Sequence, residues 1–171
     1  MRFNGFERGR ARNNGEPNGR SDFRTQGLIG VAIKVNSGHL DQIREHGEKT
    51  YPHECCGFLL GVREGEINLL AEVHAAQNER QDNRETRYLI TPEQSKRADD
   101  YARSRGIGVI GYYHSHPDHP AAPSGYDLDH SCWPGESYII VAVEHGKAAA
   151  LNSFTKPDYT HFEPEEILIE G

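Results

Sequence analysis

The sequence has few cysteines, no long apolar run and no excess of positive charge. Its three cysteines, of which Cys55 and Cys56 are adjacent, make a poor disulfide framework for 171 residues, so a reducing cytoplasm is the expected compartment. No stretch approaches the roughly 20 apolar residues of a membrane helix, and the N-terminus lacks the apolar core of a secretory signal. The formal charge of −7 argues against a nucleic-acid-binding protein, because neutralising phosphates requires clustered Lys and Arg.

The charge is unevenly distributed along the chain. Residues 1–27 hold six Arg and no Lys against three acidic residues, a net of +3, which leaves −10 on the remainder. Residues 1–26 are rich in Arg, Asn and Gly and cannot bury enough apolar surface to fold alone. We therefore expect a disordered basic tail over 1–26, with a basic arm that contacts a partner as the alternative. One domain should span 27–171, and its acidic balance favours a partner with a basic face.

Hydrophobic patterning predicts an α+β domain. Strands are expected at 28–35, 56–62, 67–74, 88–90, 107–113, 138–143, 148–154 and 167–169, and helices at 38–49, 92–106 and 124–132. Ser37 is the expected N-cap of the first helix. Thr91 and Gln94 form a capping box, with Pro92 at the first helical position. Because regular βαβ alternation and internal repeats are both absent, we expect a mixed sheet with helices packed against it.

One segment carries residue types that bind metals. His114 and His116 lie two positions apart at the end of an apolar strand, so their imidazoles should point to the same face and reach one ion. Ser124 at a helix N-cap places Asp127 in the first turn, from which its carboxylate can turn back to that ion. Two His and one carboxylate leave one position of a tetrahedral zinc open for water, which is typical of a catalytic site.

Such a zinc lowers the pKa of its water to about 7 and polarises the carbonyl group under attack. It also needs a group that transfers protons, and Glu54 is the candidate. The alternative for Glu54 is an exposed carboxylate at the start of an element. However, Glu54 stands where the chain enters the apolar segment that begins with Cys55, so partial burial and a raised pKa are expected.

Other interpretations of these residues are weaker. A His-x-His pair alone is most often polar surface, and the spacing to Ser124 and Asp127 is what favours metal binding. His119 is a rival ligand, but it lies outside the strand phase and should contact solvent or substrate. The alternative for Ser124 is a purely structural N-cap. That role can coexist with a catalytic one in which the hydroxyl faces an oxyanion.

Two other enzyme classes fit poorly. A thiol protease would need a cation that stabilises a thiolate, and neither Cys55 nor Cys56 has an obvious one nearby. A zinc deaminase would need the patterns H-x-E and P-C-x-x-C, and both are missing. Asp129 and His130 should lie on the surface of a helix.

The motifs together resemble the JAMM/MPN+ zinc metalloproteases, in particular the prokaryotic stand-alone members. The resemblance rests on the pattern His-x-His, seven residues, Ser-x-x-Asp, with Glu54 sixty residues upstream of the first His in the segment 52–61. The apolar strand before the His pair, Pro117 and the helix start at 89–92 also match. The resemblance covers residues 31–154, which is nearly all of the expected domain.

This resemblance implies a fold, a site and an activity. The fold would be α+β of the cytidine-deaminase-like three-layer type, with a mixed central sheet flanked by helices. One zinc ion per chain would be held by His114, His116 and Asp127, with Glu54 as the acid/base and Ser124 stabilising the oxyanion. The reaction would be hydrolysis of a peptide or isopeptide bond after the C-terminal Gly of a ubiquitin-like protein.

The resemblance leaves the substrate open between two classes. One is a sulfur-carrier protein trimmed after its Gly-Gly end, which we favour slightly, and the other is a lysine-linked conjugate of such a protein. The alternative of another kind is a catalytically silent scaffold with the same fold. All five site positions are present, which counts against that alternative.

Overall fold

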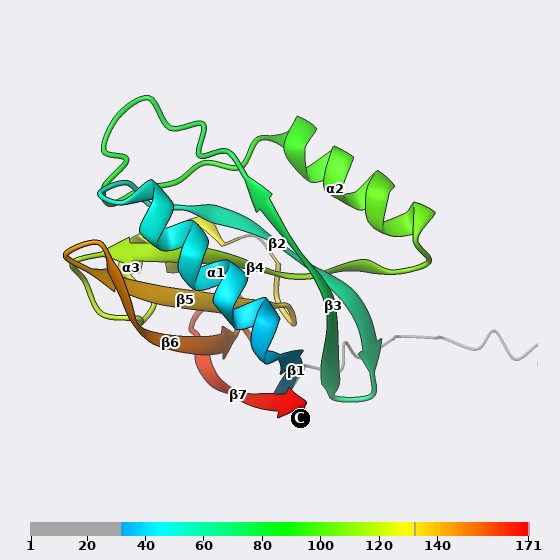
Figure 1. The fold of residues 1–171 in the computed structure, drawn as a ribbon. Coiled ribbons are helices and arrows are strands. Elements are labelled where there is room, and N and C mark those ends of the chain that lie inside the picture. The colour runs from blue at the N-terminus through cyan, green and yellow to red at the C-terminus, as the bar shows by residue number, and fades with distance from the viewer. Residues whose placement is uncertain (1–31, 132, 171) are drawn as a thin grey trace, which may run out of the picture.

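The structure is a computed structural model that describes residues 32–131 and 133–170. The predicted tail over 1–26 and the start of the first predicted strand lie outside the described residues. In chain order the elements are β1 Ala32–Asn36, α1 Ser37–Thr50, β2 Cys56–Glu64, β3 Ile67–Ala76, α2 Pro92–Ser104, β4 Gly108–Pro117, α3 Gly125–His130, β5 Ser137–Glu144, β6 Lys147–Thr155 and β7 Glu163–Glu170 (Figure 1).

The strands form one mixed sheet that closes into a barrel in the order β1-β3-β2-β4-β5-β6-β7. The pairs β1/β3, β1/β7 and β4/β5 are parallel, and the other neighbours are antiparallel. The expected single α+β domain with a mixed sheet is therefore confirmed. The closure of the sheet was not expected, and the three-layer, cytidine-deaminase-like description is not confirmed.

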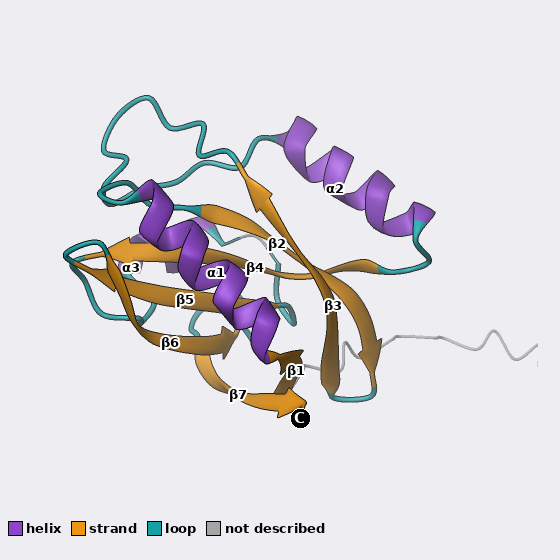
Figure 2. Cartoon of the chain, viewed as in Figure 1, coloured by secondary structure: helices purple, strands orange, loops and turns teal. Residues whose placement is uncertain are grey.

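Helices α1 and α2 belong to two separate core clusters, and Figure 2 shows the two helices apart from each other. Leu40 and Ile43 of α1 pack into the main core together with Leu59. Phe58 and Leu60, on either side of Leu59, instead pack against Ala98 and Ala102 of α2. Because successive side chains of a strand point to opposite faces, this alternation fixes which helix lies on which side of the strand.

The helix starts test the predicted caps. The capping box of α2 is confirmed, since the Gln94 N–H donates to the Thr91 side chain and the Gln94 side chain accepts from the Thr91 N–H. The predicted cap of α1 is wrong by one residue: Asn36 is the N-cap, and its side chain accepts from the His39 N–H at 2.9 Å. The buried His39 ring then completes a capping box, which Ser37 could not form.

The predicted strand over 88–90 is also wrong. These residues belong to the long loop between β3 and α2, because the Leu89 backbone bonds to Asn78 and Glu79 instead of to a sheet. The other predicted strands that fall within the described residues occur with shifts at their ends, and α2 and α3 end earlier than expected, at Ser104 and His130. Cys132, the predicted end of the last helix, lies outside the described residues.

Within the described part of the chain, no helix is long and apolar enough to cross a bilayer.

Candidate active site

Strand β4 brings His114 and His116 to one side of the barrel wall. Both are buried, and their Nε2 atoms are 3.0 Å apart. His116 Nδ1 lies 2.8 Å from the Pro120 carbonyl oxygen, which fits a tautomer in which Nδ1 donates that hydrogen bond. That tautomer leaves the Nε2 lone pair of His116 directed at the site, as a metal ligand requires.

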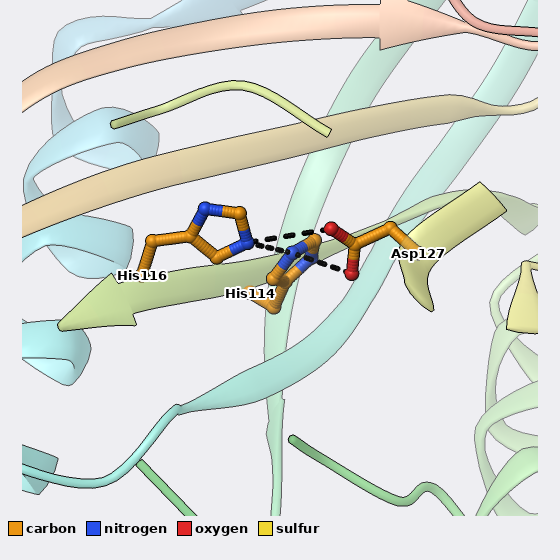
Figure 3. A group of neighbouring side chains, drawn as sticks. All are labelled: His114, His116 and Asp127. Carbon is orange, nitrogen blue, oxygen red and sulfur yellow. Dashed lines mark hydrogen bonds and ion pairs between the residues drawn. The ribbon is translucent and has the colours of Figure 1, made fainter. Parts of the chain in front are cut away.

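Helix α3 supplies the third donor from its first turn. Its N-cap is Ser124, as predicted, and the Asp127 carboxylate accepts from the Ser124 N–H at 2.7 Å and from the Ser124 hydroxyl at 2.6 Å. The same carboxylate lies 3.3 Å from His114 Nε2 and 3.4 Å from His116 Nε2. Figure 3 shows the two imidazoles of β4 and the carboxylate of α3 pointing toward one another.

The three side chains can hold one metal ion. One possible ligand atom of each lies within 4.8 Å of the others, and all three residues are buried. Two imidazoles and one carboxylate are a donor set that suits zinc. Burial opposes the charge of Asp127, but the two imidazoles beside it and the Ser124 hydroxyl outweigh burial and hold its pKa far below the usual range. Burial lowers the pKa of His114, which favours the neutral imidazole that a metal needs.

Glu54 lies beside this group, two residues before β2 begins. Its side chain is only 6% exposed, and burial raises its pKa from 4.5 to about 8. The nearby His116 lowers the pKa of Glu54, whereas the negative charge of Asp127 raises it further. The expectation of a partly buried carboxylate with a raised pKa is confirmed, and the burial is more complete than expected.

Four further residues shape the site and were not predicted from the sequence. The Ser115 hydroxyl, between the two His, accepts from the Cys55 N–H at 2.8 Å. The Tyr88 ring stacks on His114 with centroids 4.9 Å apart. Asn78 bonds to the Glu54 carbonyl, and the Arg87 guanidinium lies 4.0 Å from the Tyr126 ring centroid on α3. The one local signal for Ser115 in the sequence is a small hydroxyl residue between two candidate metal ligands.

A pocket of about 220 Å³ opens next to Asp127. It is lined mainly by aromatic and aliphatic side chains of the loop before α2, of β4, of α3 and of the segment after α3. Trp133 is 56% exposed and Leu89 is 44% exposed at this pocket. The candidate site therefore lies next to an apolar surface.

The remaining predicted positions are not members of the group of three donors. His119 is exposed and is not among the grouped donors, and Asp129 and His130 lie on the surface of α3 as expected. Cys55 and Cys56 are free thiols inside the core. Burial raises the pKa of Cys55 to about 12 and that of Cys56 further, so neither thiol suits a nucleophile.

Residues 36–155 match the family described as prokaryotic homologs of the JAB domain, and the chain belongs to that family. This confirms the resemblance to prokaryotic stand-alone JAMM/MPN proteins. A desampylase from Haloferax volcanii is 28% identical over 120 residues, which cover 70% of this chain and 84% of that protein. A probable TtuB-protein conjugate cleaving protease from Thermus thermophilus is 32% identical over 126 residues, covering 73% and 80%.

Solved structures agree with this assignment. The solution structure of a protein from Salinibacter ruber has a TM-score of 0.64 and 42% identity, covering 81% of this chain and 91% of that one. A JAB1/MPN domain protein from Archaeoglobus fulgidus has a TM-score of 0.51 and 19% identity, covering 81% and 98%. The second likeness shows the fold alone.

Proposed function

We propose that this protein is a zinc metallopeptidase that hydrolyses the bond after the C-terminal Gly of a ubiquitin-like protein. The observation that carries the proposal is the convergence of His114, His116 and Asp127 beside the buried Glu54, in a member of the JAB family. The names of the Haloferax and Thermus relatives support this substrate class.

In this proposal His114, His116 and Asp127 hold the zinc ion. When bound, zinc supplies a Lewis acid and activates water at neutral pH. Glu54 accepts the proton of the attacking water and passes it to the departing amine. A carboxyl group whose pKa is raised into the neutral range suits both transfers, because it can gain and lose a proton near the working pH.

Ser124 has an N-cap role in the structure and an oxyanion role in the proposal. Its hydroxyl donates to Asp127, so it would have to rotate to donate to a developing oxyanion. Ser124 is exposed, which leaves its hydroxyl accessible to a substrate. An oxyanion donor of this kind is typically worth about 100- to 1000-fold in rate.

The proposed substrate is a ubiquitin-like protein of the sulfur-carrier type that ends in Gly-Gly. The name of the Thermus relative refers to conjugate cleavage, which favours an isopeptide bond to a lysine over trimming of a C-terminal extension. A catalytically silent scaffold would need neither three converged metal donors nor a buried acid beside them.

The direct test compares two linkages after Gly-Gly. Zinc-loaded protein is mixed with ubiquitin-like proteins that carry either a lysine isopeptide or a peptide extension, and masses are read with and without a chelator. We expect cleavage after the second Gly that stops when zinc is removed. Cleavage by Glu54→Gln at the wild-type rate would end the proposal, and Glu45→Gln, an exposed carboxylate on α1, is the matched control.

A further inference from the structure

The long loop between β3 and α2, residues 77–91, contacts three elements of the proposed site. We call it the site loop. Its Arg84 carbonyl accepts from the Glu54 N–H at 2.7 Å. Its Tyr88 ring stacks on His114, and its Arg87 guanidinium lies over the Tyr126 ring of α3, one residue before Asp127. The conformation of the site loop therefore bears on the acid/base, on a metal ligand and on the helix that carries another ligand.

One buried side chain in this loop uses all of its hydrogen-bonding capacity. The Asn78 amide nitrogen donates to the Glu54 carbonyl at 3.1 Å and to the Arg87 carbonyl at 3.0 Å. Its amide oxygen accepts from the Arg80 N–H at 3.0 Å and from the Leu89 N–H at 3.1 Å. An Asn side chain offers two donor hydrogens and two acceptor lone pairs, so all four are in use.

One of these four bonds joins the site loop to Glu54, two residues before β2, and the other three hold the loop together. The Glu54 backbone gives its N–H to the loop and receives a hydrogen bond from it, so neither of its polar groups depends on solvent. The bonds to Arg87 and Leu89 bracket Tyr88, whose ring lies against His114. Asn78 is itself only 7% exposed, so water cannot easily replace a lost bond.

We infer that Asn78 is a positioning residue that fixes Glu54 and the Tyr88 ring relative to His114. The catalytic part of this inference rests on the proposed function, because it takes Glu54 as the acid/base. The side chain must be an amide. A carboxylate would turn an oxygen toward two carbonyl oxygens that now accept hydrogen bonds at 3.0–3.1 Å, and would repel both.

The test substitutes Asn78→Asp in the full chain, with Asn83→Asp as the matched control. Asn83 lies in the same loop, is exposed, and its side chain contacts Asp82. The first readout is backbone amide hydrogen exchange in the metal-free proteins. We expect exchange at Glu54 and Leu89 to quicken about tenfold or more in Asn78→Asp, with the amides of β5 within about twofold of wild type.

The second readout is steady-state kinetics of the zinc-loaded proteins. We expect kcat to fall about 10- to 100-fold, while KM and the zinc dissociation constant stay within about twofold. The control should match wild type in both readouts. If Asn78→Asp does not fold, the same two measurements are made on Asn78→Ser. This variant removes the amide without adding a charge.

Three results would overturn the inference. They are unchanged exchange at Glu54, exchange that quickens equally throughout β5, and a kcat within about twofold of wild type. A wild-type protein that cleaves no Gly-Gly substrate would instead refute the proposed function. The exchange measurement would then still decide whether Asn78 holds the site loop against Glu54.

Discussion

The Ser115 hydroxyl accepts a hydrogen bond of 2.8 Å from the Cys55 N–H, and the Ser115 N–H donates to the Cys55 carbonyl. The strand position between the two histidines is thereby joined to the residue that follows Glu54. Because Ser115 is fully buried, these bonds set the spacing between the proposed acid/base and the proposed metal ligands without help from water.

Ser115→Ala should destabilise the protein and lower its activity. The substitution leaves the buried Cys55 N–H without its side-chain acceptor, which costs about 1–3 kcal/mol. Urea unfolding measures this loss, and Ser104→Ala, an exposed serine at the end of α2, is the control. Equal free energies of unfolding for Ser115→Ala and wild type would show that this hydrogen bond does not stabilise the protein.

Asp127→Asn should lose zinc while Asp129→Asn keeps it. The first substitution removes one of three grouped donors, whereas Asp129 is an exposed carboxylate on the same helix. Metal analysis after dialysis should give about one zinc per chain for wild type and Asp129→Asn, and far less for Asp127→Asn. Full zinc content in Asp127→Asn would remove this carboxylate from the ligand set.

Glu54→Gln should abolish turnover, keep zinc, and stabilise the metal-free protein at alkaline pH. The folded-state pKa of Glu54 is raised from 4.5 to about 8, so the unfolded chain loses this proton first. The resulting loss of stability is absent below about pH 4.5, grows as the pH rises, and is complete above about pH 8.

The substitution removes that loss, so the variant should gain on the order of 3–5 kcal/mol over wild type at pH 9 and almost nothing at pH 4.5. Urea unfolding with a chelator present measures both points. A difference between the proteins that is the same at both pH values would contradict the burial of an ionisable Glu54.

Lys156→Met should weaken zinc binding from a distance. The Lys156 ammonium is 1% exposed and donates to the Leu128 carbonyl and to the carbonyl and hydroxyl of Ser131. These acceptors lie at the C-terminal end of the short helix that carries Asp127. Without the ammonium, that end of the helix loses the three hydrogen bonds that hold it in place. We expect a zinc dissociation constant about tenfold higher. The exposed Lys147→Met should leave it unchanged.

The parts of the site that sequence reasoning could predict depend on local geometry. The common direction of His114 and His116 follows from the period of a strand, and the place of Asp127 follows from an N-cap three residues earlier. The cap of α2 was predictable for the same reason. At the start of α1, by contrast, Asn36 and Ser37 are adjacent candidates, and only the contact with His39 decides between them.

The parts that sequence reasoning missed depend on contacts between distant residues. Asn78 meets Glu54 across 24 positions, and Tyr88 lies against His114 only because the loop folds over β4. The apolar residues 88–90 looked like a strand because their partner, a proposed metal ligand beside a pocket, is not visible in a local pattern. Barrel closure likewise needs β1 to pair with β7, from the opposite end of the described chain.

The most direct test of the account is the location of the metal in zinc-soaked crystals by anomalous diffraction. We predict one strong peak at about 2.0–2.2 Å from Nε2 of His114, Nε2 of His116 and a carboxylate oxygen of Asp127. A peak elsewhere, or none while these side chains point apart, would contradict it.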